Sequence, residues 1–276
     1  MELDPNILTS GKLTVYGLFH AQVRRNPDAI AVEYEGIKWS YKKLDACVRR
    51  LAGILTEHNV SKGDRIAILS ENRPEYVITE LACAMTGAII ACQNWRLSPK
   101  ELQHCISLVH PKLIIVSNRF VDNLKSLEIP DLQVINFDES YCSLINNATE
   151  GSPCHNLGPE DGLVILYTSG TTGVPKGVML THDNVCRNLL SIGELIELIE
   201  TKFNMEEKVF LSFLPVAHSF ERVGGHYGCF NAGMQIYYAQ SMETVIPNIQ
   251  EVRPTFLTAV PRIFEKIHAK VMESVE

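Results

Sequence analysis

Hydrophobic residues fall in short runs along this chain, and the stretches between the runs carry hydrophobic positions at helical spacing. The run at residues 65–70 follows a turn at Lys62-Gly63-Asp64 and is typical of a buried strand. Pro74 then begins a stretch with helical spacing that continues to Gly87. The same alternation predicts strands at residues 88–92, 112–117, 133–137, 163–167, 209–213, 234–238 and 255–259, and helices at residues 99–108, 181–200, 244–252 and from 261 to the end.

This alternation also predicts the fold class. Strands that are joined by helical crossovers run parallel, so we expect an α/β fold with largely parallel sheets flanked by helices.

Residues 29–35 and 38–41, on either side of Gly36, predict a hairpin. The polar stretch at residues 138–160 predicts a loop that divides the chain into lobes of about residues 1–160 and 161–276. The last predicted helix has no visible C-cap, so we expect the chain to be part of a longer protein.

Charge and hydropathy narrow the range of partners. The chain has 276 residues, and 25 Lys and Arg against 32 Asp and Glu give a formal net charge of −7. Proteins that bind duplex nucleic acid usually carry a basic surplus, so nucleic acid is not an expected partner. The longest nearly apolar run, residues 81–92, is shorter than the about 20 residues that span a bilayer. We therefore expect no membrane span, while peripheral contact with a membrane stays open.

The cysteines and the amino terminus indicate a cytoplasmic protein. The eight cysteines are scattered, without C-x-x-C spacing and without histidines at the spacing of zinc ligands. The start, Met1-Glu2-Leu3-Asp4-Pro5, is acidic where a secretory signal is basic. We therefore expect reduced and mostly buried thiols.

One segment, residues 167–177 (Tyr-Thr-Ser-Gly-Thr-Thr-Gly-Val-Pro-Lys-Gly), combines glycines, hydroxyl side chains and a lysine directly after a predicted strand. Glycines let backbone N–H groups turn toward a common point and let a bulky anion approach closely. The hydroxyls add hydrogen-bond donors, and Lys176 adds a mobile cation behind the stiff Pro175. The segment predicts a polyphosphate-binding loop, and the alternative is a flexible surface loop.

Three other motifs do not match this loop. In a Walker A loop a Ser or Thr follows the lysine, whereas Gly177 follows Lys176 here. A dinucleotide-binding fingerprint requires glycines at G-x-G spacing, which the chain lacks. A nucleophile elbow requires a glycine where Tyr167 stands. An ordinary P-loop NTPase is therefore disfavoured.

Residues 167–177 closely resemble the AMP-binding signature of the adenylate-forming superfamily, which comprises acyl-CoA synthetases, peptide-synthetase adenylation domains and luciferases. Residues 180–184 (Leu-Thr-His-Asp-Asn) continue this signature, and residues 39–44 (Trp-Ser-Tyr-Lys-Lys-Leu) are similar to an early motif of the family. Two segments resemble the long-chain fatty-acid–CoA ligase branch, namely residues 214–222 (Leu-Pro-Val-Ala-His-Ser-Phe-Glu-Arg) and 254–262 (Pro-Thr-Phe-Leu-Thr-Ala-Val-Pro-Arg). The resemblance implies an incomplete N-terminal AMP-binding domain, with the C-terminal swinging domain absent.

The resemblance further implies a two-step reaction that uses ATP, Mg²⁺ and CoA. A fatty-acid carboxylate attacks the α-phosphate of ATP to give an acyl-adenylate and pyrophosphate, and the CoA thiol then displaces AMP. Lys176 and His218 are the expected catalytic residues, and Thr168 is expected to help hold magnesium, although carboxylates are the usual ligands of this ion. The residues expected to bind the phosphates of ATP are Thr168, Ser169, Gly170, Thr171, Thr172, Gly173 and Lys176.

The segment around His218 predicts a substrate pocket. The resemblance implies that His218 walls the carboxylate end, and a buried core histidine is the alternative. Gly224 and Gly225 leave room for an acyl chain, or they allow close packing of a helix on a sheet. The adjacent Glu221 and Arg222 are candidates for a structural ion pair.

Further residues near the motifs have smaller expected roles. Ser219 stands close to the position where amino-acid-activating relatives carry an Asp for the substrate ammonium, which favours a substrate without an amine. Glu221, an acid only two residues further on, weakens this preference. Thr181 is expected to cap the helix that follows it, and His182 and Asp183 are expected to take part in this cap rather than in catalysis. Arg262 is a candidate for contact with an anion.

The later motifs of the family are not found before Glu276. These motifs supply the adenine contact, a magnesium-binding glutamate, a ribose-binding aspartate and the catalytic lysine of the swinging domain. We therefore expect residues 1–276 alone to have weak or no activity. The leading hypothesis is a fatty-acid–CoA ligase for medium or long chains. The alternatives are a fatty acyl-AMP ligase or another adenylation domain, and a non-catalytic nucleotide-binding or scaffold protein.

Overall fold

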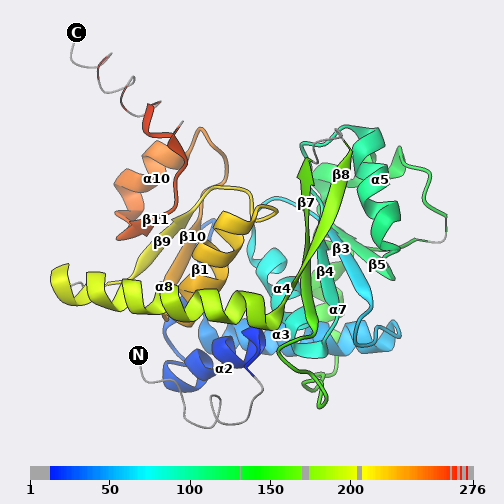
Figure 1. Ribbon diagram of the computed structural model, residues 1–276, viewed down its shortest axis with the longest axis horizontal. Coiled ribbons are helices and arrows are strands. Elements are labelled where there is room, and N and C mark those ends of the chain that lie inside the picture. Colours follow the sequence, from blue (N-terminus) through cyan, green and yellow to red (C-terminus); the bar gives the residue numbers. More distant parts are fainter. Residues whose placement is uncertain are drawn as a thin grey trace.

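The computed structural model describes residues 13–130, 132–169, 174–203, 207–261, 263–265, 268 and 272. Their strands form two sheets, which stand side by side in Figure 1. The five-stranded sheet, in the order β11-β9-β10-β1-β2, contains β1 (Ile30–Tyr34), β2 (Ile37–Ser40), β9 (Val209–Ser212), β10 (Gln235–Tyr238) and β11 (Phe256–Leu257). The six-stranded sheet, in the order β6-β5-β3-β4-β7-β8, contains β3 (Arg65–Leu69), β4 (Ile89–Cys92), β5 (Leu113–Val116), β6 (Gln133–Asn136), β7 (Gly162–Ser169) and β8 (Pro175–Thr181).

Neighbouring strands are parallel except in the hairpins β1–β2 and β7–β8. The longer described helices are α2 (Val15–Arg25), α3 (Tyr41–Glu57), α4 (Pro74–Thr86), α5 (Pro99–Val109), α8 (His182–Phe203) and α10 (Val245–Val252). The short ones are α6 (Val121–Lys125), α7 (Cys142–Asn147), α9 (Gly228–Asn231), the 3₁₀-helix η1 (Asn118–Phe120) and the π-helices η2 (Phe137–Tyr141) and η3 (Phe220–Tyr227). These layers confirm an α/β fold with largely parallel sheets flanked by helices.

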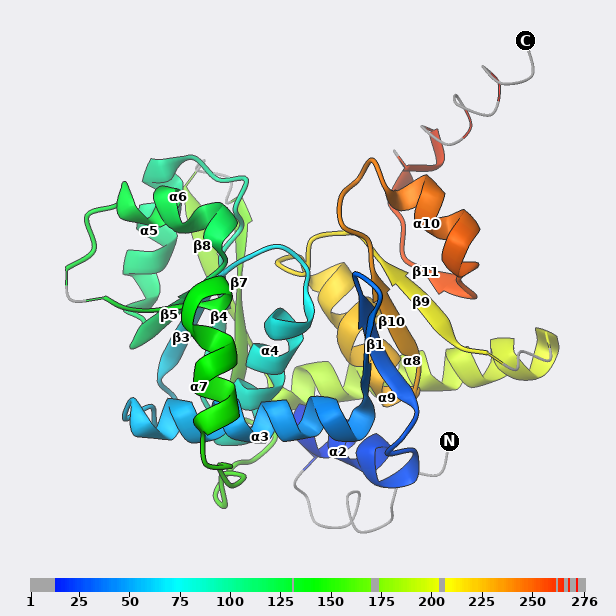
Figure 2. The same cartoon turned by 180° about the vertical axis from the view of Figure 1, so that it is seen from behind.

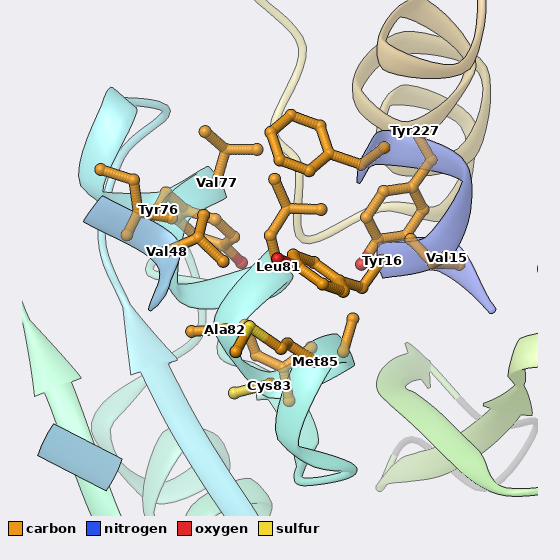
Figure 3. Packing of buried hydrophobic residues seen from close by; sticks show 14 of the residues in the cluster. Val15, Tyr16, Val48, Tyr76, Val77, Leu81, Ala82, Cys83, Met85 and Tyr227 are labelled. Atoms are coloured by element: carbon orange, nitrogen blue, oxygen red, sulfur yellow. The ribbon is translucent and has the colours of Figure 1, made fainter. Parts of the chain in front are cut away.

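Helix α4 lies between the two sheets in both views (Figures 1 and 2) and is buried almost entirely. Pro74 occupies its first turn, and Gly87 ends it with a φ of +78°, a left-handed conformation that glycine adopts without strain. Its side chains meet those of α2, α3 and η3 in the core, as Figure 3 shows for Tyr16 and Tyr227. The apolar run at residues 81–92 therefore belongs to the interior, and none of the described helices is long and apolar enough to cross a bilayer.

Most predicted elements are confirmed, usually to within a residue or two at each end. The predicted start of α5 is a complete capping box, in which Ser98 Oγ accepts from Glu101 N and the Glu101 carboxylate accepts from Ser98 N. The predicted hairpin around Gly36 is β1–β2. Five of the eight cysteines are buried, as expected: Cys83, Cys92, Cys105, Cys186 and Cys229.

The stretch at residues 138–160 is not the continuous loop that its polar composition predicts. The helices η2 and α7 cover its first part, and they bring Phe137, Tyr141 and Ile145 into the core at intervals of four residues. The polar residues Asp138, Glu139 and Ser140 separate the first two of these positions, and they hide the helical spacing in the sequence. Strand β8 is also unpredicted, because most of its side chains are exposed and only pairing with β7 defines it.

Neither sheet begins or ends at the expected boundary near residue 160, because each sheet contains strands from both sides of it. Val32 of β1 is paired with Ile236 of β10, so the amino-terminal hairpin belongs to the sheet of the last strands. Ile90 of β4 is paired with Val164 of β7, so residues beyond 160 extend the sheet of β3 to β6. Partners this far apart leave no trace in the local pattern. The described residues from Pro261 on are helical, and the remainder of the last predicted helix lies outside them.

Candidate active site

The predicted phosphate-binding loop connects two paired strands. Strand β7 ends at Ser169, β8 begins at Pro175, and Thr168 is paired with Lys176 across the hairpin. Side chains directly opposite each other in antiparallel strands lie on the same face of the sheet, and both of these are exposed. The hairpin thus presents a hydroxyl and an ammonium group together at the base of the loop. Gly170, Thr171, Thr172 and Gly173 lie outside the described residues, and of Ser169 only the strand pairing is described.

Helix α5 holds the base of this hairpin in place. The Tyr167 hydroxyl donates to the Cys105 carbonyl at 2.8 Å and accepts from Gln93 Nε2 at 3.1 Å. The His104 Nε2 atom lies 3.1 Å from the Pro175 carbonyl oxygen, one residue before Lys176. Sequence reasoning missed Gln93, Cys105 and His104, because only Tyr167 stands within the motif and its partners lie on other elements.

His218 follows β9 in a turn rather than in the core. Its N–H donates to the Pro215 carbonyl at 3.0 Å, and its carbonyl accepts from Arg222 N at 3.1 Å. The imidazole is exposed, which excludes a core histidine. Partial loss of water, and secondarily the positive charge of Arg96, lower the pKa of His218. The ring is therefore neutral at neutral pH and adds no charge to the surface that it lines.

The two predicted pocket glycines on η3 differ in their surroundings. A Cβ atom on Gly225 would lie 3.1 Å from both the Phe210 ring and the Glu221 carboxyl carbon. A Cβ atom on Gly224 would meet only Thr258 Cγ2, at 4.0 Å. Gly225 therefore serves close packing of η3 on β9, whereas Gly224 leaves open space.

Glu221 and Arg222 do not form the ion pair that their adjacency suggested. The buried Glu221 carboxylate accepts from Ser212 Oγ at 2.6 Å and from Thr258 Oγ1, and burial raises its pKa. The fully buried Arg222 guanidinium is paired instead with Glu80 of α4. Successive residues of η3 point in different directions, so each side chain reaches a different neighbour.

Several partners complete the buried site of Arg222. The guanidinium donates to the Tyr76 hydroxyl at 3.0 Å and to Cys92 Sγ at 2.8 Å. The His226 Nδ1 atom lies 3.2 Å from Glu80 Oε2. A buried charge is stable only when such partners surround it, so this cluster joins η3 firmly to α4.

The start of α8 has a structural role. Thr181 Oγ1 accepts from Asn184 N, and Asn184 Oδ1 accepts from Thr181 N, so these two residues form the cap rather than His182 and Asp183. The buried His182 ring accepts from Val15 N at 3.3 Å, and Asp183 is paired with Arg187 at 2.6 Å. Burial lowers the pKa of His182 to about 4. Arg262 lies outside the described residues.

A pocket of about 200 Å³ lies at the carboxyl ends of strands from both sheets. In open α/β sheets ligands bind at this edge. The pocket includes none of the predicted site residues, but Arg96 on its wall is the cation that acts on His218. A larger groove of about 830 Å³, lined by Gln22, Glu33 and Lys208 among others, lies at the opposite edge of the five-stranded sheet, away from the motifs. Size alone therefore does not identify the site.

A magnesium ion beside ATP is usually held by one or two carboxylates together with phosphate oxygens. In the described ranges, no three His, Cys, Asp or Glu side chains come together as metal ligands. Thr168 is paired with a lysine, not with an acidic residue. The described residues therefore do not fit a complete magnesium site.

A family model described as "AMP-binding enzyme" matches residues 19–275. The chain belongs to this family. Fatty acyl-CoA synthetase A of Dictyostelium discoideum is 28% identical over 265 residues, which cover 86% of this chain and 38% of that protein. Long chain acyl-CoA synthetase 1 of Arabidopsis thaliana is 27% identical over 298 residues, which cover 95% of this chain and 44% of that protein. The chain thus spans less than half the length of these two curated relatives.

Solved structures show the same fold. An inhibitor-bound N-terminal domain of FACL13 from Mycobacterium tuberculosis has a TM-score of 0.79 at 24% identity, covering 91% of this chain and 64% of that one. VinN has a TM-score of 0.80 at 20% identity, covering 94% of this chain and 64% of that one. These solved structures therefore share the fold of this chain.

Proposed function

We propose that the protein to which this chain belongs is an ATP-dependent fatty-acid–CoA ligase. The observation that carries the proposal is the β7–β8 hairpin, which brings Thr168 and Lys176 together at the base of a loop rich in glycine and hydroxyl groups. Its family membership and its long-chain acyl-CoA synthetase relatives point to the same activity.

In the first step, an oxygen of the fatty-acid carboxylate forms a bond to the α-phosphorus of ATP, and the bond to the bridging oxygen of pyrophosphate breaks. The negative charge of the departing pyrophosphate needs donors that are already oriented. Lys176 supplies a cation, Gly170 and Gly173 supply backbone N–H groups, and the remaining donors are the hydroxyls of Ser169, Thr171 and Thr172. The Thr168 hydroxyl is the group of this hairpin that would help to hold magnesium, whose remaining ligands the described residues do not supply.

In the second step, the sulfur of CoA bonds to the acyl carbonyl carbon and the thiol proton passes to solvent. The bond between this carbon and the phosphate oxygen of the adenylate breaks, and AMP leaves. His218 walls the pocket that holds the carboxylate end during both steps. Its lowered pKa keeps the ring neutral, so it can donate or accept a hydrogen bond without adding charge. The open space beside Gly224 is where we expect the acyl chain to begin.

The environment of Glu221 supports a substrate without an amine. Ser219 follows His218 directly, and the nearest acid of this segment turns inward to Ser212 and Thr258. A buried and hydrogen-bonded carboxylate is not available to a substrate ammonium group. Glu221 therefore does not weaken the preference for a fatty acid over an amino acid.

Pyrophosphate release by the intact polypeptide with palmitate, ATP and CoA tests the proposal. We expect palmitate-dependent release and formation of palmitoyl-CoA, and little turnover by residues 1–276 alone. Accumulation of palmitoyl-AMP without transfer to CoA would instead indicate a fatty acyl-AMP ligase. ATP binding without pyrophosphate release for any carboxylate would indicate a non-catalytic nucleotide-binding protein. Robust turnover by residues 1–276 would contradict the expectation for that part.

A further inference from the structure

The two halves of the proposed site are carried by different sheets. Lys176 and its loop belong to the six-stranded sheet, whereas His218 follows β9 of the five-stranded sheet. In-line attack requires the carboxylate and the α-phosphate to be held at a defined separation. Side chains that reach from one sheet to the other are therefore the ones that set this separation.

Asn72 makes such a connection from the segment between β3 and α4. Its Nδ2 group donates to the Leu214 carbonyl at 2.7 Å and to Ser212 Oγ at 3.2 Å. Its Oδ1 atom accepts from Val216 N at 3.1 Å. One carboxamide thus holds the end of β9 and the turn that leads to His218.

Arg222 holds the same turn on its other side. Its guanidinium is fixed by Glu80 of α4, the helix that begins at Pro74, two residues after Asn72. The Arg222 N–H donates to the His218 carbonyl at 3.1 Å. The exposed His218 imidazole is therefore placed by backbone that is tied to α4 both before and after it.

We propose that Asn72 is a positioning residue that sets the distance between the carboxylate wall at His218 and the phosphate loop at Lys176. The inference rests on the proposed function, and it adds a residue that lies outside every motif named above. When the carboxamide is lost, the turn can shift relative to the six-stranded sheet, while the phosphate loop stays anchored on α5 by Tyr167. Selection for the fatty acid should then weaken, whereas binding of ATP should not.

Palmitate-dependent exchange of pyrophosphate into ATP by the intact polypeptide tests this inference. For Asn72→Ala we expect kcat/KM for palmitate to fall by about 100-fold, the effect of a displacement of about 1 Å, while the KM for ATP stays within about twofold. Asn72→Asp retains the acceptor for Val216 N but places a carboxylate against the Leu214 carbonyl. We expect its kcat/KM for palmitate to fall at least as much as that of the alanine variant. If Asn72→Ala does not fold, Asn72→Asp provides the test.

Asn136→Ala is the matched control. Asn136 is a buried asparagine of β6 with two comparable bonds, from its Nδ2 to Asn118 Oδ1 at 2.7 Å and from Asp138 N to its Oδ1 at 2.9 Å. It lies at the far edge of the six-stranded sheet, so its loss should lower the melting temperature without changing the KM for palmitate relative to that for ATP.

The outcomes separate this inference from the proposed function. A KM for ATP that rises as much as kcat/KM for palmitate falls in Asn72→Ala, or changes no different from those of Asn136→Ala, would overturn the role of Asn72. Absence of palmitate-dependent exchange in the wild type would refute the proposed function itself.

Discussion

His182 should make the folded chain sensitive to acid. Its ring is fully buried at the start of α8, and burial lowers its pKa from the ordinary 6.5 to about 4. The unfolded chain takes up a proton on this ring near pH 6.5, whereas the folded chain does so only near pH 4. Between these values the unfolded state binds more protons, so acidification favours unfolding. At about 1.4 kcal/mol for each pKa unit, the stability lost from this group by pH 4 is about 3 kcal/mol.

His182→Asn isolates this contribution, because an amide oxygen can still accept from Val15 N but does not titrate in this range. The free energy of unfolding is measured by urea titration, followed by circular dichroism, at several pH values between 7.5 and 4. We expect the difference in stability between wild type and variant to change by about 3 kcal/mol across this range, in favour of the variant at low pH. His110→Asn makes the same exchange at an exposed position and should keep the acid sensitivity of the wild type. Identical acid sensitivity of His182→Asn and the wild type would refute the reasoning.

Four other substitutions test the site and its support. Lys176→Ala in the intact polypeptide should slow adenylation by about 100-fold, measured by pyrophosphate exchange, and unchanged kinetics would remove this lysine from its role. Gly225→Ala should lower the free energy of unfolding by about 1–3 kcal/mol, measured by thermal unfolding, because the added Cβ meets packed atoms. Gly224→Ala should leave this free energy nearly unchanged, and equal effects of the two variants would contradict the surroundings assigned to them. Arg222→Met should cost about 3–5 kcal/mol in chemical unfolding because the buried Glu80 carboxylate loses its guanidinium partner, and a cost below about 1 kcal/mol would show that this pair does not hold η3.

Much of the fold follows from local signals. Buried parallel strands read as continuous apolar runs, which is why β3, β4 and β5 were predictable. The capping box at Ser98 and the glycine after α4 mark helix ends through backbone chemistry that involves only neighbouring residues. The candidate phosphate-binding loop was predictable as a motif because its residues are contiguous in the sequence.

The contacts that join the two sheets were not predictable. Glu80 lies in a predicted helix and Arg222 lies between two predicted strands, and nothing local indicates that the two charged side chains are buried against each other. In the sequence, Asn72 is typical of a turn shortly before a proline. Its three hydrogen bonds are made with residues more than 100 positions away. These contacts depend on how the two sheets pack against each other. Only the structure shows that the adjacent Glu221 and Arg222 bind different partners.

The most direct test of the proposed site is a crystal structure of the intact polypeptide with a non-hydrolysable ATP analogue. We expect the β- and γ-phosphates to lie within hydrogen-bond distance of Lys176 Nζ and of the loop between β7 and β8. Phosphates bound elsewhere, with Lys176 and Thr168 facing only solvent, would contradict the assignment of the hairpin and, with it, the proposed ligase.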